Sequence, residues 1–162
     1  MSPEQRGGAS SDGGTPPERR GAEAMRDLVA ELCLIPSPSR HERVIADHLS
    51  AHFTAMGALV SEDAAATTTR GTAGNLVAVL RGELPRRVVL AAHMDTVPLV
   101  ADEPLRVISD GTVLRSSGRQ ILGADDKAGV AIVLEVLERF SRLDAARRPT
   151  LIAAITVCEE IG

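Results

Sequence analysis

Two stretches in the first third of the chain repeat apolar residues at helical spacing. Residues 25–32 form the first stretch, which ends before Pro36. The second follows Ser39 and Glu42, whose spacing is that of a capping box, and it ends at Gly57. The face that carries most of its apolar residues comprises Val44, Ile45, His48, Leu49, His52, Phe53 and Met56. The pattern predicts two amphipathic helices packed on a core.

Further along, short apolar runs alternate with one long helical pattern. The runs of strand length cover residues 75–80, 88–92 and 151–157. Residues 126–140 carry a run of apolar side chains over about four turns, which suits a helix packed on a sheet. Turn residues between His93 and Gly123 predict loops around a short β-hairpin. This alternation predicts an α/β domain with a mixed sheet flanked by helices.

Composition excludes several classes of protein. The chain has 162 residues, of which 44% are hydrophobic and 25% charged, enough for about one domain. A net charge of -4 and the absence of Trp and Tyr argue against nucleic-acid binding. No run reaches the ~18 apolar residues of a membrane span, and no signal peptide is evident, so we expect a cytoplasmic protein. Residues 1–23, rich in Gly, Pro and charged residues, indicate a disordered tail before a domain over 24–162.

Two pairs of residues that can bind metals have a structural interpretation instead. Cys33 and Cys158 lie far apart among apolar neighbours, so we expect two buried reduced thiols rather than a disulfide. His48 and His52 are spaced like an i, i+4 metal pair. They lie on the apolar stripe of their helix and no carboxylate pattern accompanies them. Partly buried core histidines are therefore the favoured interpretation, and metal ligands the alternative.

Residues able to bind metals also follow the ends of predicted strands. His93 and Asp95 come directly after the strand over 88–92, at the edge where open α/β folds bind ligands. His93 is therefore a candidate metal ligand, and Asp95 is a candidate to orient its ring. Glu159 and Glu160 follow the last predicted strand and lie beside His93 if the two strands are neighbours. One glutamate can then bind metal while the other acts as a base.

Asp125 and Asp126 lie where a loop opens the long predicted helix, with Gly123 and Gly129 allowing close backbone approach. Two interpretations are open at this point. An aspartate at a helix N-terminus is a normal cap and complements the helix dipole. The same carboxylates could also bind a metal. Taken singly, each of the three motifs is ambiguous.

In order along the chain, the three motifs resemble those of the co-catalytic zinc peptidase family that contains peptidase T, glutamate carboxypeptidase and the succinyl-diaminopimelate desuccinylases. The motifs are HMDTVP at 93–98, LGADDKAG at 122–129 and EEIG at 159–162. Their spacings, 125 − 93 = 32 and 159 − 125 = 34 residues, fit that family. The resemblance covers residues 25–162 and is strongest to the peptidase T-like branch.

This resemblance implies the catalytic domain of a zinc exopeptidase with two Zn²⁺ ions. His93 would bind one ion, Glu160 would bind the other, and Asp125 would bridge both. Asp126 would help to set the bridging geometry. Two cations ~3.5 to 4 Å apart lower the pKa of a shared water towards ~7 and polarise the scissile carbonyl.

The resemblance also assigns the remaining residues and the reaction. Asp95 would orient His93, and Glu159 would be the general base that takes a proton from the attacking water. The implied reaction is hydrolysis of peptide bonds in short peptides, as by an aminopeptidase or tripeptidase. A deacylase or carboxypeptidase of the same family is an alternative. A truncated, inactive product that acts only through partner binding is another.

Members of the family continue past the glutamate pair to a further acidic ligand, a lid or dimerisation domain and a late His ligand, none of which follows here. Each zinc would keep only two protein ligands instead of three, so we expect weak zinc binding. We also expect an uncovered edge at the strand over 151–157, and hence marginal stability and self-association. A homodimer is expected of the full-length form.

Overall fold

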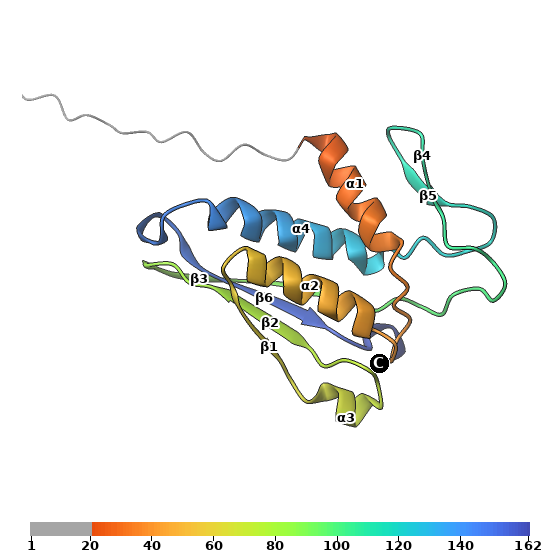
Figure 1. Ribbon diagram of the computed structural model, residues 1–162, viewed down its shortest axis with the longest axis horizontal. Helices are drawn as coiled ribbons and strands as arrows, with labels where there is room; N and C mark the ends of the chain where they lie inside the picture. The colour runs from red at the N-terminus through yellow and green to blue at the C-terminus, as the bar shows by residue number, and fades with distance from the viewer. Residues whose placement is uncertain (1–20) are drawn as a thin grey trace, which may run out of the picture.

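The computed structural model describes residues 21–162, and the tail expected over residues 1–23 lies almost entirely outside them. A four-stranded sheet in the order β1-β2-β6-β3 lies at its centre (Figure 1). Its strands are β1 (Leu59–Glu62), β2 (Leu76–Leu80), β3 (Leu84–His93) and β6 (Pro149–Thr156). β6 runs antiparallel to β2 and parallel to β3. The mixed sheet predicted from the sequence is therefore confirmed.

Three helices lie together over one face of this sheet (Figure 1). They are α1 (Ala22–Cys33), α2 (Arg43–Ala55) and α4 (Ala124–Ser141), and they confirm the three helical patterns of the sequence. Along β2 and β6 buried residues alternate with half-buried ones, because successive side chains of a strand point to opposite faces. The strand residues of the core are Leu76, Ala78, Leu80, Ala92, Leu151, Ala153 and Ile155.

Smaller elements complete the fold. The predicted hairpin is formed by β4 (Val107–Ser109) and β5 (Leu114–Ser116). Neither α3 (Ala65–Thr69) nor the edge strand β1 was predicted. Three of the four residues of β1 are exposed, so it lacks the apolar run that marks a strand. Short 3-10 helices cover Ala145–Arg147 and Glu159–Ile161.

The capping box predicted at the start of α2 is wrong. The helix begins at Arg43, so Glu42 directly precedes it and Ser39 lies too far upstream to cap it. The buried Glu42 carboxylate instead accepts a hydrogen bond from the backbone amide of Arg40, 2.7 Å away. The Ser39 hydroxyl donates to Asp95 Oδ2 over 2.7 Å. Both side chains therefore hold the loop before α2 instead of capping the helix.

The expectation of an uncovered edge at residues 151–157 is also wrong. β6 pairs with β2 on one side and with β3 on the other, so it is an inner strand. β1 and β3 form the two edges of this sheet, and Val89 on β3 is 61% exposed. Cys33 and Cys158 are free and buried, as predicted. No helix within residues 21–162 is long and apolar enough to cross a membrane.

Candidate metal centre

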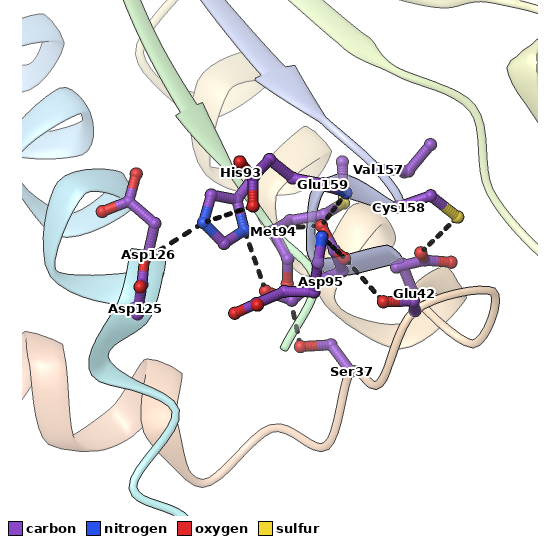
Figure 2. Close-up of polar contacts among 12 residues, drawn as sticks. Ser37, Glu42, His93, Met94, Asp95, Asp125, Asp126, Val157, Cys158 and Glu159 are labelled. Carbon is purple, nitrogen blue, oxygen red and sulfur yellow. Dashed lines mark hydrogen bonds and ion pairs between the residues drawn. The ribbon is translucent and has the colours of Figure 1, made fainter. Parts of the chain in front are cut away.

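The pairing of β3 with β6 brings two of the sequence motifs together. The strands are parallel, and His93 at the end of β3 lies opposite Thr156 at the end of β6. The segments that follow β3 and β6 therefore leave the sheet at the same end of the two strands. Asp95 follows β3 there, and the short helix that begins at Glu159 follows β6 (Figure 2). The neighbouring strands on which the sequence prediction depended are thus present.

Asp95 holds the backbone of the glutamate pair. Its side chain is completely buried. Its Oδ1 accepts a hydrogen bond from the Glu159 amide over 3.0 Å, and its Oδ2 accepts one from the Glu160 amide over 3.1 Å. Hydrogen bonds to an ionised acceptor are stronger than neutral ones. A single carboxylate, that of Asp95, therefore anchors the backbone of the turn that carries both glutamates.

The ring of His93 is oriented mainly by the main chain of Asp95. Nδ1 lies 3.1 Å from the Asp95 carbonyl oxygen and 3.4 Å from Asp95 Oδ1. The other ring nitrogen, Nε2, points to Asp125 Oδ1 at 3.1 Å (Figure 2). A metal-binding histidine commonly has one nitrogen fixed in this way, which leaves the other free for the metal. Nε2 is thus the nitrogen available to a cation.

The two aspartates at the start of α4 have different surroundings. Asp126 Oδ1 accepts a hydrogen bond from the backbone amide of Gly129 over 3.0 Å, which is a capping contact. A Cβ atom on Gly129 would lie 2.3 Å from that oxygen, so the close approach requires glycine. Asp125, like Asp126, has non-helical backbone angles at the start of α4, and its side chain is 86% exposed beside His93. The capping interpretation therefore holds for Asp126, and Asp125 is free to act as a ligand.

Three of the predicted ligands form one group. His93, Asp125 and Glu160 each offer a ligand atom, and these atoms all lie within 4.8 Å of one another. Glu159 Oε2 lies 3.8 Å from His93 Nε2. The floor of this group is buried, because His93 is 11% exposed, whereas Glu159 is 60% exposed at its rim. A small molecule can therefore approach the group from solvent.

The electrostatics of this group favour a cation. Burial alone lowers the pKa of His93, but the nearby Asp125, Asp95 and Glu159 outweigh it, so the pKa is raised. One imidazole nitrogen and several carboxylate oxygens are the ligands that Zn²⁺ takes in hydrolytic enzymes. The donor set therefore fits a divalent transition metal.

Comparison with known proteins agrees with this geometry. Residues 75–162, more than half of the chain, match the model of peptidase family M28. The chain belongs to peptidase family M28. The matched part includes both strand ends and all five predicted site residues: His93, Asp95, Asp125, Glu159 and Glu160. The sequence resemblance to zinc metallopeptidases of the peptidase T type is thereby confirmed.

The relatives of this M28 chain include several peptidases. The chain is 34% identical over 133 residues to the uncharacterized protein YqjE of Bacillus subtilis, covering 82% of this chain and 35% of that protein. A tripeptidase of Staphylococcus aureus has a similar structure, with a TM-score of 0.74, 34% identity and coverage of 86% of this chain and 37% of that one. Aminopeptidase PepT of Bacillus cereus gives a TM-score of 0.77, 31% identity and the same coverages, 86% and 37%. These similarities confirm the exopeptidase-like α/β fold.

The M28 chain spans only part of its relatives. It covers between 22% and 35% of the length of the curated relatives it matches. The comparisons therefore establish the family and the fold of this part, and the activity of a whole protein is a proposal.

Sequence reasoning missed Lys127 of the M28 chain. This lysine is 2% exposed, and its ammonium group donates a hydrogen bond to the Ile35 carbonyl oxygen. Burial lowers its pKa to about 8. Lys127 thus ties the start of α4 to the segment after α1. Its spacing from Val130 and Leu134 places it on the buried face of the helix, and this was the signal available.

Proposed function

We propose that this protein hydrolyses peptide bonds in short peptides, with two Zn²⁺ ions, as an aminopeptidase or tripeptidase. The observation that carries the proposal is the group of His93, Asp125 and Glu160, whose ligand atoms lie within 4.8 Å of one another. Glu159 lies beside this group with its carboxylate in solvent. The similarity to a tripeptidase and to an aminopeptidase supports the same reaction.

The three ligands would divide between the two ions. His93 would bind one ion through Nε2, Glu160 would bind the other, and Asp125 would contribute an oxygen to each. Support for this division comes from His93 Nδ1, which already contacts the Asp95 carbonyl oxygen, and from the Asp125 carboxylate, which is 86% exposed and contacts His93 Nε2 through Oδ1. When bound, zinc polarises the scissile carbonyl and lowers the pKa of a water molecule.

Glu159 would be the general base. It would accept a proton from the attacking water and pass it to the nitrogen of the leaving amine. Its carboxylate is 60% exposed and lies 3.8 Å from His93 Nε2, close to the ligands without being one of the three. Asp95 would act as a positioning residue, since it holds the Glu159 amide. Asp95 thereby anchors the backbone from which the Glu159 side chain projects.

We also propose a cytoplasmic location for the protein and a homodimer for its full-length form. These two proposals, like the absence of nucleic-acid binding and the extent of the tail, come from the sequence and its resemblance. Measurement of the molecular mass in solution and of the cellular location would test them directly.

The test of the reaction uses the protein isolated from its natural source and three substrates. These are trialanine, trialanine with an acetylated N-terminus and trialanine with an amidated C-terminus. We expect release of alanine from the two peptides with a free N-terminus, loss of this activity in a chelator and its return with added Zn²⁺. Cleavage that requires a free C-terminus would indicate a carboxypeptidase, and removal of the acetyl group a deacylase. No cleavage of any substrate would overturn the proposal.

A matched variant tests the role of the base. Glu159→Gln keeps the shape of the side chain and removes its basicity. We expect turnover to fall by about 10²–10⁴-fold while the zinc content stays unchanged. Turnover close to that of the unmodified protein would contradict the assignment of Glu159.

A further inference from the structure

A second group of metal-binding side chains lies on the helices. Glu31 of α1 and His48 and His52 of α2 each offer a ligand atom, and these atoms lie within 4.8 Å of one another. None of these residues belongs to the centre at the strand ends. No carboxylate was predicted beside the histidine pair, because the carboxylate comes from a different helix. α1 and α2 lie on the same side of the sheet (Figure 1).

The distances within this group suit one metal ion. His48 Nε2 lies 3.6 Å from Glu31 Oε1, and the centroids of the two imidazole rings are 4.6 Å apart. Two ligands of a tetrahedral Zn²⁺, each about 2.0–2.1 Å from the metal, are about 3.4 Å apart. Small side-chain rotations would therefore bring all three ligand atoms to bonding distance. His48 and His52 are one helical turn apart, so their rings project from the same side of α2.

His48 makes no hydrogen bond through Nε2 within the described part of the chain, although Glu31 Oε1 lies 3.6 Å away. Its Nε2 atom is buried and has no hydrogen-bond partner among residues 21–162. A buried polar atom without a partner costs about 1–3 kcal/mol.

We infer that Glu31, His48 and His52 bind a divalent transition metal, such as Zn²⁺, that joins α1 to α2. Glu31 is 56% exposed, so an ion can enter from solvent. A cavity of about 380 Å³ opens beside His52 between α2 and α4, and neither Glu31 nor His48 lines it. The ion would link two helices that pack on the same core, and its role would be structural.

The test isolates this site by removing the other one. In a background that combines His93→Ala with Glu160→Ala, each ion of the strand-end centre loses its own ligand, and calorimetric titration with Zn²⁺ should show one remaining binding event. Adding Glu31→Gln or His52→Gln should weaken that event at least tenfold, since even the loss of a residue that only supports a ligand weakens binding about 10–100-fold. His41 is an exposed histidine outside both groups, so His41→Gln is the matched control and should leave the affinity unchanged.

A second readout follows from linkage. Zn²⁺ bound to the folded state raises the melting temperature by mass action. We expect this rise in the His93→Ala, Glu160→Ala protein and its loss when Glu31→Gln is added. Because Glu31 is on the surface, this variant should fold, and circular dichroism checks that it does. The inference is overturned if the His93→Ala, Glu160→Ala protein binds no Zn²⁺, or if Glu31→Gln and His52→Gln both leave the affinity unchanged.

Discussion

Two groups of histidine and carboxylate side chains in this chain differ in what holds them. At the strand ends, His93 Nδ1 contacts the Asp95 carbonyl oxygen, and the Asp95 carboxylate holds the amides of Glu159 and Glu160. On the helices, His48 Nε2 has no hydrogen-bond partner among the described residues. The centre at the strand ends is therefore preorganised by its neighbours, and the helix group depends on its own side chains.

This difference supports our proposal that the group at the strand ends, and not the helix group, is catalytic. Catalytic side chains must be held close to one geometry, which requires a supporting layer of hydrogen bonds. Asp95 supplies that layer at the strand ends. A metal that only links two helices has no such requirement. Changes to supporting residues should therefore affect the centre at the strand ends and leave the helix group unaltered.

The largest effect is expected from the ligand itself. His93→Ala removes the nitrogen ligand of the centre, and we expect Zn²⁺ affinity there to fall at least about 100-fold. Binding at the helix group should stay unchanged. Calorimetric titration of the unmodified protein and of His93→Ala measures Zn²⁺ binding at the strand-end centre and at the helix group. Equal loss at both groups would show that they are not independent.

Asp95→Asn should have the next largest effect. The asparagine side chain keeps one acceptor oxygen but turns an NH₂ group towards a backbone amide that Asp95 now satisfies. We expect a loss of about 1–3 kcal/mol in the free energy of unfolding. Zn²⁺ affinity at the centre should fall about 10–100-fold. Urea unfolding and zinc titration measure these changes. Ser39→Ala removes only one hydroxyl contact to Asp95 and should be milder; an effect as large as that of Asp95→Asn would contradict this account.

Gly129→Ala should disturb the other side of the centre. The added Cβ would lie 2.3 Å from Asp126 Oδ1 and would displace the cap of α4. We expect a loss of about 1 kcal/mol in the free energy of unfolding. Asp126→Ala removes the same contact, so the double variant should lose less than the sum of the single losses. Fully additive losses would show that the two residues act separately.

The smallest effect is expected at the start of α2, the helix that carries His48 and His52. Arg43 donates two hydrogen bonds to Glu62, at 2.9 and 3.1 Å. Both side chains are partly exposed, so Glu62→Gln should lower the free energy of unfolding by less than about 1 kcal/mol at pH 7.

The pH dependence of this effect follows from the pKa of Glu62. The hydrogen bond from Arg43 lowers that pKa below its ordinary value of 4.5. A carboxyl group with a lowered pKa stabilises the folded state fully above its unfolded value, and the contribution is lost as pH falls through the folded value. Urea unfolding at pH 7 and pH 3 should therefore show a smaller difference between the two proteins at pH 3. An equal difference at both values would exclude this ion pair as the cause.

Much of this fold could be predicted, because its inner elements carry strong apolar periodicity. The helices α1, α2 and α4 and the strands β2, β3 and β6 all follow from such patterns. β1 was missed because an exposed edge strand has no apolar run. The uncovered edge was misplaced because strand order depends on long-range pairing, which no local pattern encodes. The pairing of β3 with β6 entered the sequence analysis only as a condition: the glutamate pair lies beside His93 if the two strands are neighbours.

The candidate site shows the same limit. His93, Asp125 and Glu160 were named from motifs, and the structure brings their ligand atoms together. The contacts of Asp95 with backbone amides could not be predicted, since they depend on how two distant turns meet in space. Glu31 was missed as a partner of the histidines of α2 for the same reason.

The most direct test of the central claim compares two adjacent residues. The account makes Glu160 a metal ligand and Glu159 a base that does not bind metal. Glu160→Gln and Glu159→Gln are identical chemical changes at neighbouring positions, and calorimetric titration with Zn²⁺ measures both. We predict that Glu160→Gln lowers the Zn²⁺ affinity at least tenfold, because even the loss of a residue that only supports a ligand lowers it about 10–100-fold. We predict an unchanged Zn²⁺ affinity in Glu159→Gln. Unchanged affinity in Glu160→Gln, or a large loss in Glu159→Gln, would contradict the account.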